Sequence, residues 1–80
     1  MALDRNLSTP LYHQVRDLLL EEIQSGGISP GEKIPSEAEL GARYGISRIT
    51  ARQAIQSLVH EGLLYRQQGR GTFVARPRVR

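Results

Sequence analysis

The side chains with the most evident chemistry are two arginines, Arg48 and Arg52, which lie four residues apart. In a helix they share a face, and no acidic residue stands three or four positions from either one to form an ion pair along that helix. The guanidinium group is a planar fork that donates two hydrogen bonds at once to guanine or to phosphate. The spacing therefore predicts a surface that binds an anionic partner.

Other donors and acceptors surround this pair. Ser47 and Thr50 offer hydroxyl groups to phosphate, and Gln53 offers an amide that can read adenine, although glutamine is also common at exposed helix positions that contact nothing. Further along, Arg70 stands between two glycines that suit a tight turn and leave the backbone bare enough to approach a sugar-phosphate chain. The predicted DNA-binding residues are Ser36, Ser47, Arg48, Thr50, Arg52, Gln53, Gly69 and Arg70.

Catalytic and metal-binding chemistry finds little support in the sequence. The two histidines, His13 and His60, have no spacing typical of a metal site or of a nucleophile with its base, and there is no cysteine. The run Gly69-Arg70-Gly71 lacks the length and the lysine of a nucleotide-binding loop. We therefore expect no enzyme, no metal and no cofactor.

Three helices can be placed from caps and periodicity. Thr9-Pro10 predicts the start of the first helix, with threonine as the N-cap, and apolar residues then recur on one face over 11–23. Ser36 and Glu39 form the pattern of a capping box, which begins a short second helix that Gly45 ends. Ser47 is expected to cap a third helix running to about Glu61.

The rest of the chain predicts a small hairpin. Residues 63–66 and 72–74 have the pattern of strands joined by a tip at 67–71, and Lys33-Ile34 could add a short third strand. The expected fold is mainly α, a winged helix-turn-helix of three helices and a two- to three-stranded antiparallel wing. Its core on the third helix is predicted to consist of Ala51, Ala54, Ile55, Leu58 and Val59.

Charge divides the chain into unlike halves. Residues 1–42 carry a net charge of −4 and residues 43–80 a net charge of +7, which favours nucleic acid as the partner of the second half. We expect a flexible arm at 1–9, one domain at 10–74 and the start of a linker at 75–80. The longest apolar run, 18–20, is too short for a membrane span, and a cytoplasmic location is expected.

These motifs together resemble the DNA-binding domain of the GntR family of bacterial regulators. The matching stretches are Pro-Leu-Tyr-x-Gln at 10–14, Ile-Ser-Pro-Gly-Glu-Lys-Ile-Pro-Ser-Glu at 28–37, Gly-Ile-Ser-Arg-x-Thr-x-Arg-x-Ala at 45–54, Leu-x-x-Glu-Gly-Leu at 58–63 and Gly-x-Gly-Thr-Phe-Val at 69–74. The Pro-Leu-Tyr opening is similar to the HutC-like and YtrA-like branches. Two departures are Ala38, where many relatives carry a basic residue, and Ala51, where valine is usual.

The resemblance implies a domain that reads double-stranded DNA, a palindromic operator, for a metabolite-responsive repressor. It implies that Arg48, Arg52 and Gly69 contact DNA. It also implies a homodimer in the full-length parent and a small-molecule effector bound only by the absent C-terminal domain, so that these eighty residues alone should be monomeric. The alternative is a winged helix that binds another protein, for which an apolar or mixed third helix would be expected in place of one rich in arginine.

Overall fold

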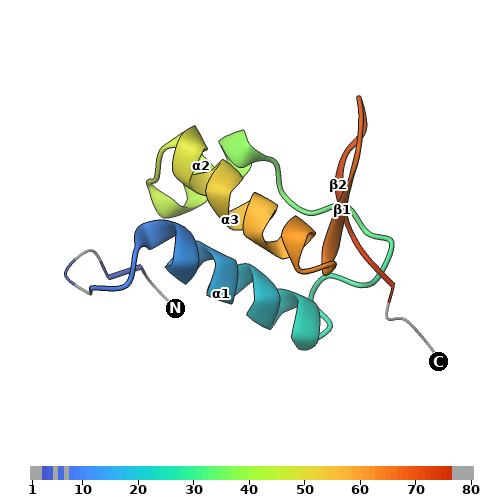
Figure 1. Ribbon diagram of the computed structural model, residues 1–80, viewed down its shortest axis with the longest axis horizontal. Helices are drawn as coiled ribbons and strands as arrows, with labels where there is room; N and C mark the ends of the chain where they lie inside the picture. The colour runs from blue at the N-terminus through green and yellow to red at the C-terminus, as the bar shows by residue number, and fades with distance from the viewer. Residues whose placement is uncertain (1–2, 5, 7, 77–80) are drawn as a thin grey trace.

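The computed structural model describes residues 3–4, 6 and 8–76 of the chain (Figure 1). In chain order the elements are α1 (Leu11–Gln24), α2 (Glu37–Tyr44), α3 (Arg48–His60), β1 (Leu64–Gln67) and β2 (Gly71–Val74). The predicted architecture of three helices and a small antiparallel wing is thus confirmed. Of the expected linker at 75–80, only 75–76 belong to the described residues, and positions 1–2, 5 and 7 of the expected arm lie outside them.

The core lies where α1 and α3 pack together. On α3 the predicted apolar stripe is buried at Ala51, Ala54, Ile55 and Leu58, whereas Val59 is only partly buried. Both alanines are fully buried, so a larger side chain at either position would have to displace its neighbours. The other buried apolar residues are Val15, Leu19, Ile28, Ile34, Leu40, Leu64 and Val74.

Each helix begins as its capping residues dictate, except α1. Proline 10 rather than Thr9 occupies the N-cap of α1, because its ψ of 148° is extended and no side chain caps the helix. The sequence-based assignment of Thr9 was therefore wrong by one residue. The Pro10 carbonyl instead accepts hydrogen bonds from the backbone N–H groups of His13 (3.1 Å) and Gln14 (3.2 Å).

A three-residue turn joins α2 to α3. Gly45 ends α2 in the left-handed conformation, with φ 65°, which is strained for any residue that carries a Cβ. The backbone N–H of Ile46 donates to the Gly41 carbonyl (3.1 Å), which satisfies one more group at the helix end. Ser47 then caps α3, as the sequence predicted. Because the turn is this short, the start of α3 is held beside α2.

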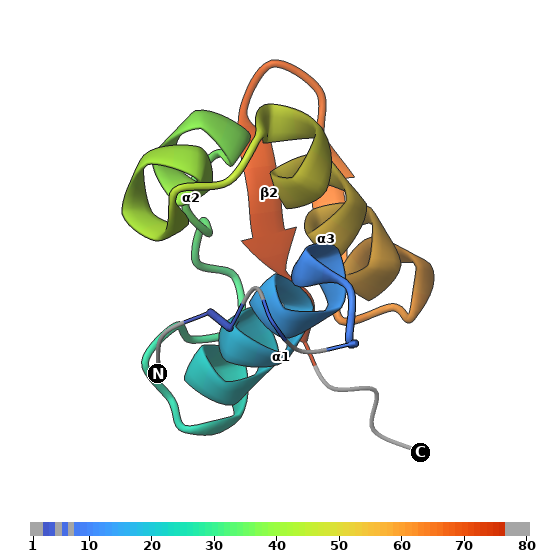
Figure 2. The ribbon, with the colours of Figure 1, turned by 90° about the vertical axis from the view of Figure 1, so that its left-hand side faces the viewer.

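The wing is a hairpin of β1 and β2, with Leu64 opposite Val74 and Gln67 opposite Gly71. A third segment lies beside β2 with one antiparallel bridge, between Lys33 and Phe73, where the sequence suggested a short strand. The Ile34 N–H donates to the Thr72 carbonyl (2.9 Å) and the Val74 N–H to the Glu32 carbonyl (2.9 Å), which hold the segment there. In Figures 1 and 2 the tip of the wing and α2 both lie on the side of the molecule away from α1. One face therefore carries α2, the start of α3 and the wing tip.

Candidate nucleic-acid interface

The first turn of α3 presents polar groups that are already hydrogen-bonded to one another. Ser47 Oγ accepts from the backbone N–H of Thr50 (3.1 Å) and donates to Thr50 Oγ1 (2.9 Å). Thr50 can still donate its own hydroxyl proton, which suits a phosphate oxygen. Capping therefore explains why serine stands at position 47, and a DNA contact by either hydroxyl stays a prediction.

The second helix begins with the capping box that its sequence predicts. The Ser36 backbone N–H donates to Glu39 Oε1 (3.0 Å), and Ser36 Oγ accepts from the Glu39 backbone N–H (3.1 Å). These bonds lower the pKa of Glu39, chiefly because the Ser36 backbone N–H donates to the carboxylate. Ser36 is exposed and lines the groove described below, so its side chain serves the helix and borders the site at once.

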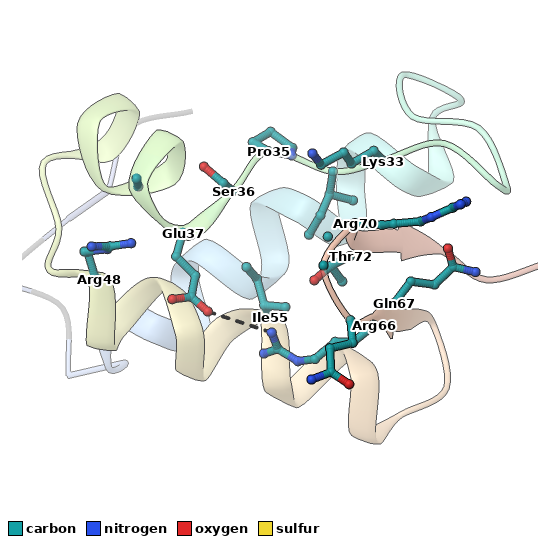
Figure 3. Close-up of a pocket in the computed structure, with 15 residues that line it drawn as sticks. Lys33, Pro35, Ser36, Glu37, Arg48, Ile55, Arg66, Gln67, Arg70 and Thr72 are labelled. Atoms are coloured by element: carbon teal, nitrogen blue, oxygen red, sulfur yellow. Dashed lines mark ion pairs between the residues drawn. The ribbon is translucent and has the colours of Figure 1, made fainter.

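A groove of about 480 Å³ separates the wing from α2 and α3 (Figure 3). Its walls bring together three predicted site residues in addition to Ser36: Arg48 from α3, and Gly69 and Arg70 from the wing tip. In Figure 3 Arg48 and Arg70 lie at opposite ends of the groove. Ala38 also lines it, so the departure from the family pattern noted above falls within the site.

Charge in the groove is predominantly positive. Four cationic side chains line it, Lys33, Arg48, Arg66 and Arg70, against one carboxylate, that of Glu37. Such an excess in a concave surface attracts an anion that can follow the groove, because field lines concentrate between low-dielectric walls. The arrangement fits a phosphate chain better than a compact ligand.

Glu37 overturns one step of the sequence argument. Its carboxylate pairs with Arg52 (Nη2 to Oε1, 3.3 Å) and with Arg66 (Nη1 to Oε2, 3.8 Å), the latter drawn in Figure 3. Arg52 has no acidic partner along its own helix, as the sequence indicated, but α2 supplies one from fifteen positions away, so Arg52 is paired and not free as the sequence pattern suggested. Arg48 has no ion pair within the part of the chain that the structure describes.

Gln53 lies away from the groove. It borders a separate shallow depression together with Tyr12, Gln56, Ser57 and His60. The structure therefore places Arg48 at the groove and Gln53 at the depression beside α1, whereas Ser47, Thr50 and Arg52 line neither of them.

The wing tip is built to expose Arg70. The Arg70 backbone N–H donates to the Gln67 carbonyl (3.0 Å), which closes the turn, and Gly69 takes φ 77° within it. At the base of the turn a Cβ on Gly71 would lie 2.6 Å from Lys33 Cε. Glycine at this position therefore leaves room for the lysine side chain to lie across the wing.

Sequence reasoning missed Lys33, Glu37, Arg66 and Gln67, all of which line the groove. Arg66 ends the predicted first strand and Gln67 begins the predicted tip, and an exposed cation beside a glycine-tipped hairpin was a usable signal. Lys33 and Glu37 carried none, because only the fold brings them to the wing and to α3.

Neither histidine takes part in a catalytic or metal-binding cluster. His13 pairs with Asp17 on α1 (3.4 Å), and His60 borders the outward depression. Across residues 3–4, 6 and 8–76 there is no group of three histidine, aspartate or glutamate side chains that could hold a metal ion. No helix in that same part of the chain is long and apolar enough to cross a membrane.

Comparison with known proteins gives one consistent result. The profile described as bacterial regulatory proteins, gntR family, matches residues 11–74. The transcriptional repressor NagR of Bacillus subtilis is 44% identical over 79 residues, which is 99% of this chain and 32% of that protein. This chain thus spans about a third of the length of the curated relatives it matches.

Solved structures agree with this result. The DNA-binding domain of AraR in complex with operator ORX1 has a TM-score of 0.85 and 47% identity, over 91% of this chain and 92% of that one. YtrA from Sulfolobus acidocaldarius, a GntR-family transcription factor, has a TM-score of 0.86 and 35% identity, over 92% and 78% of the two chains.

Proposed function

This chain belongs to the GntR family of bacterial regulatory proteins, and from that premise we propose that it is the sequence-specific DNA-binding head of a transcriptional repressor. HutC- and NagR-type repressors are among its relatives, as the opening motif predicted, and these relatives are named as regulators rather than enzymes. The predictions of family and of a non-enzymatic regulator are therefore confirmed. We further propose a cytoplasmic location, where the operator is accessible.

The observation that carries the proposal is the cationic groove between the start of α3 and the wing. The N-terminal part of a recognition helix enters the major groove of B-DNA, which admits one helix. With α3 placed there, the wing tip reaches the neighbouring phosphates or the minor groove, and the groove between them receives the intervening backbone. Arg52 and Gln53 are proposed to read bases, and Arg70, Ser47 and Thr50 to contact the backbone.

Selection of binding sites from a pool of random duplexes tests the proposal directly. One enriched sequence should emerge, and its affinity should fall with salt. The logarithm of the binding constant drops about 0.9 per phosphate neutralised for each unit of log salt. With four cations around the groove, the slope should be about −3 to −4 per half-site. The proposal would be refuted if no sequence were enriched at about 50 mM salt, or if the affinity did not change with salt concentration.

A second part of the proposal concerns assembly. One recognition helix covers one half-site, so we propose a palindromic operator read by two copies about one helical turn apart. Dimerisation and metabolite sensing are assigned to a further domain, since linking two heads typically gains on the order of 10²–10⁴ in affinity. Residues 1–80 alone should then sediment as a monomer and bind the palindrome weakly. A tight dimer, or release of this chain from DNA by a metabolite, would contradict this assignment.

A further inference from the structure

Ile49 is a large apolar side chain that the fold leaves in solvent. Its relative exposure is 67%, and among the described residues the only other exposed large apolar side chain is Tyr65 at 38%. The Tyr65 ring stacks on Phe73 with centroids 5.7 Å apart, so its exposure is a by-product of packing in the wing. Ile49 has no such packing, so covering its side chain in a complex would be favourable.

Ile49 is placed on the part of α3 that would enter a major groove. It is the second residue of the helix, directly after Arg48, and the helical period turns it away from the buried stripe that contains Ala51 and Ile55. Arg52 and Gln53 follow it three and four positions later on the exposed side. Its β-branched side chain has few rotamers, so it offers a fixed apolar surface.

The floor of the major groove offers one apolar group to such a side chain. Guanine, cytosine and adenine carry no methyl group there, whereas thymine presents its C5-methyl group beside an O4 acceptor. We propose that Ile49 determines specificity for thymine by packing against this methyl group. The inference rests on the DNA-binding function proposed above and adds a base that none of the polar residues would select.

The helix geometry also limits where that thymine lies. Ile49 and Arg52 are three positions apart, which corresponds to about 4.5 Å along the helix axis. One base-pair step is about 3.4 Å. The thymine should therefore lie within one or two base pairs of the base that Arg52 contacts.

Replacing thymine by deoxyuridine removes the methyl group and nothing else, so it isolates this contact. After site selection, each thymine of the selected duplex is replaced in turn, and the dissociation constant of the 80-residue chain is measured. One position per half-site should weaken binding about fourfold, the value expected for one buried methyl group. Ile49→Ala should bind the thymine duplex similarly weakly and should no longer distinguish it from the deoxyuridine duplex.

A control variant separates this effect from general loss of affinity. Arg70→Ala should bind both duplexes more weakly and keep the thymine-to-deoxyuridine ratio of the parent chain. Circular dichroism melting should show that Ile49→Ala is folded, because the Ile49 side chain is exposed and contributes little to the core. Enrichment of a site in which no deoxyuridine substitution matters would overturn the inference while leaving the proposed function intact. The inference would also be overturned if Ile49→Ala still distinguished the thymine duplex from the deoxyuridine duplex, or if the chain self-associated through Ile49.

Discussion

Glu37→Gln tests how the one acid in the cationic groove contributes to recognition. The Glu37 side chain is 19% exposed and lies between Arg52 at 3.3 Å and Arg66 at 3.8 Å. A carboxylate here repels the phosphates that the surrounding cations attract, yet it also holds Arg52 in one place. The variant keeps the shape of the side chain and removes its charge, so both effects change together.

Loss of the repulsion should strengthen binding to any duplex, whereas loss of the ion pair with Arg52 should weaken binding to the selected site alone. Two phosphates about 8 Å from the carboxylate each repel it by about 0.5 kcal/mol in water before screening by salt. Random duplex should therefore bind about two- to fivefold more tightly to Glu37→Gln. Immobilising a long side chain at an interface costs about 0.5–1.5 kcal/mol, and Arg52 in the variant incurs this cost on binding.

The repulsion is relieved for both duplexes, so the ratio of specific to non-specific affinity should fall by the Arg52 cost alone, about 0.5–1.5 kcal/mol, or roughly two- to thirteenfold. Titrations followed by fluorescence anisotropy, with a selected and a scrambled duplex at several salt concentrations, measure both constants. The free energy of unfolding should fall only slightly in Glu37→Gln, because ion pairs near the surface contribute about 0–1 kcal/mol each.

Glu21→Gln provides the matched control, since it removes the same charge from an exposed position on α1 outside the groove. It should leave the ratio of specific to non-specific affinity unchanged. If Glu37→Gln kept that ratio, Glu37 would not position Arg52. If it weakened binding to random duplex, the assumed repulsion between the carboxylate and the phosphates would be wrong.

Three further predictions concern the site and the elements that hold it. Arg52→Ala should lose about 1–3 kcal/mol of binding free energy on the selected site and should relax the base preference at one or two base pairs. Arg70→Ala should instead weaken binding evenly across sequences. Repeating the site selection with each variant distinguishes these outcomes. Gly45→Ala should destabilise the fold by about 1–2 kcal/mol in urea unfolding, because alanine is strained at φ 65°, and an unchanged midpoint would contradict this. Glu39→Gln should reduce stability most at neutral pH: the pKa of Glu39 is lowered in the fold, so the stabilisation is complete above its ordinary value of 4.5 and is lost as pH falls through the folded value. The difference in stability between the two proteins should therefore be larger in unfolding curves at about pH 7 than at about pH 3.

The sequence alone determined the helix starts at Ser36 and Ser47, the helix stop at Gly45 and which segment of the chain forms the wing. Each of these depends on hydrogen bonds or steric limits within three or four residues, and such local rules can be read directly from residue order. The buried stripe of α3 followed from the helical period for the same reason. Only the first helix start was misplaced, where the proline itself stands at the cap.

Tertiary structure decided what those local rules could not. The angle at which α2 crosses α3 puts Glu37 beside Arg52, and the single bridge at Lys33 brings that lysine to the wing. Neither contact is encoded in spacing, because each joins residues at least fifteen positions apart through the packing of intervening elements. The apolar period of α3 was enough to predict which side of the helix is exposed. It could not predict that Arg48 lies at the groove and Gln53 outside it, because that depends on where the wing and α1 lie.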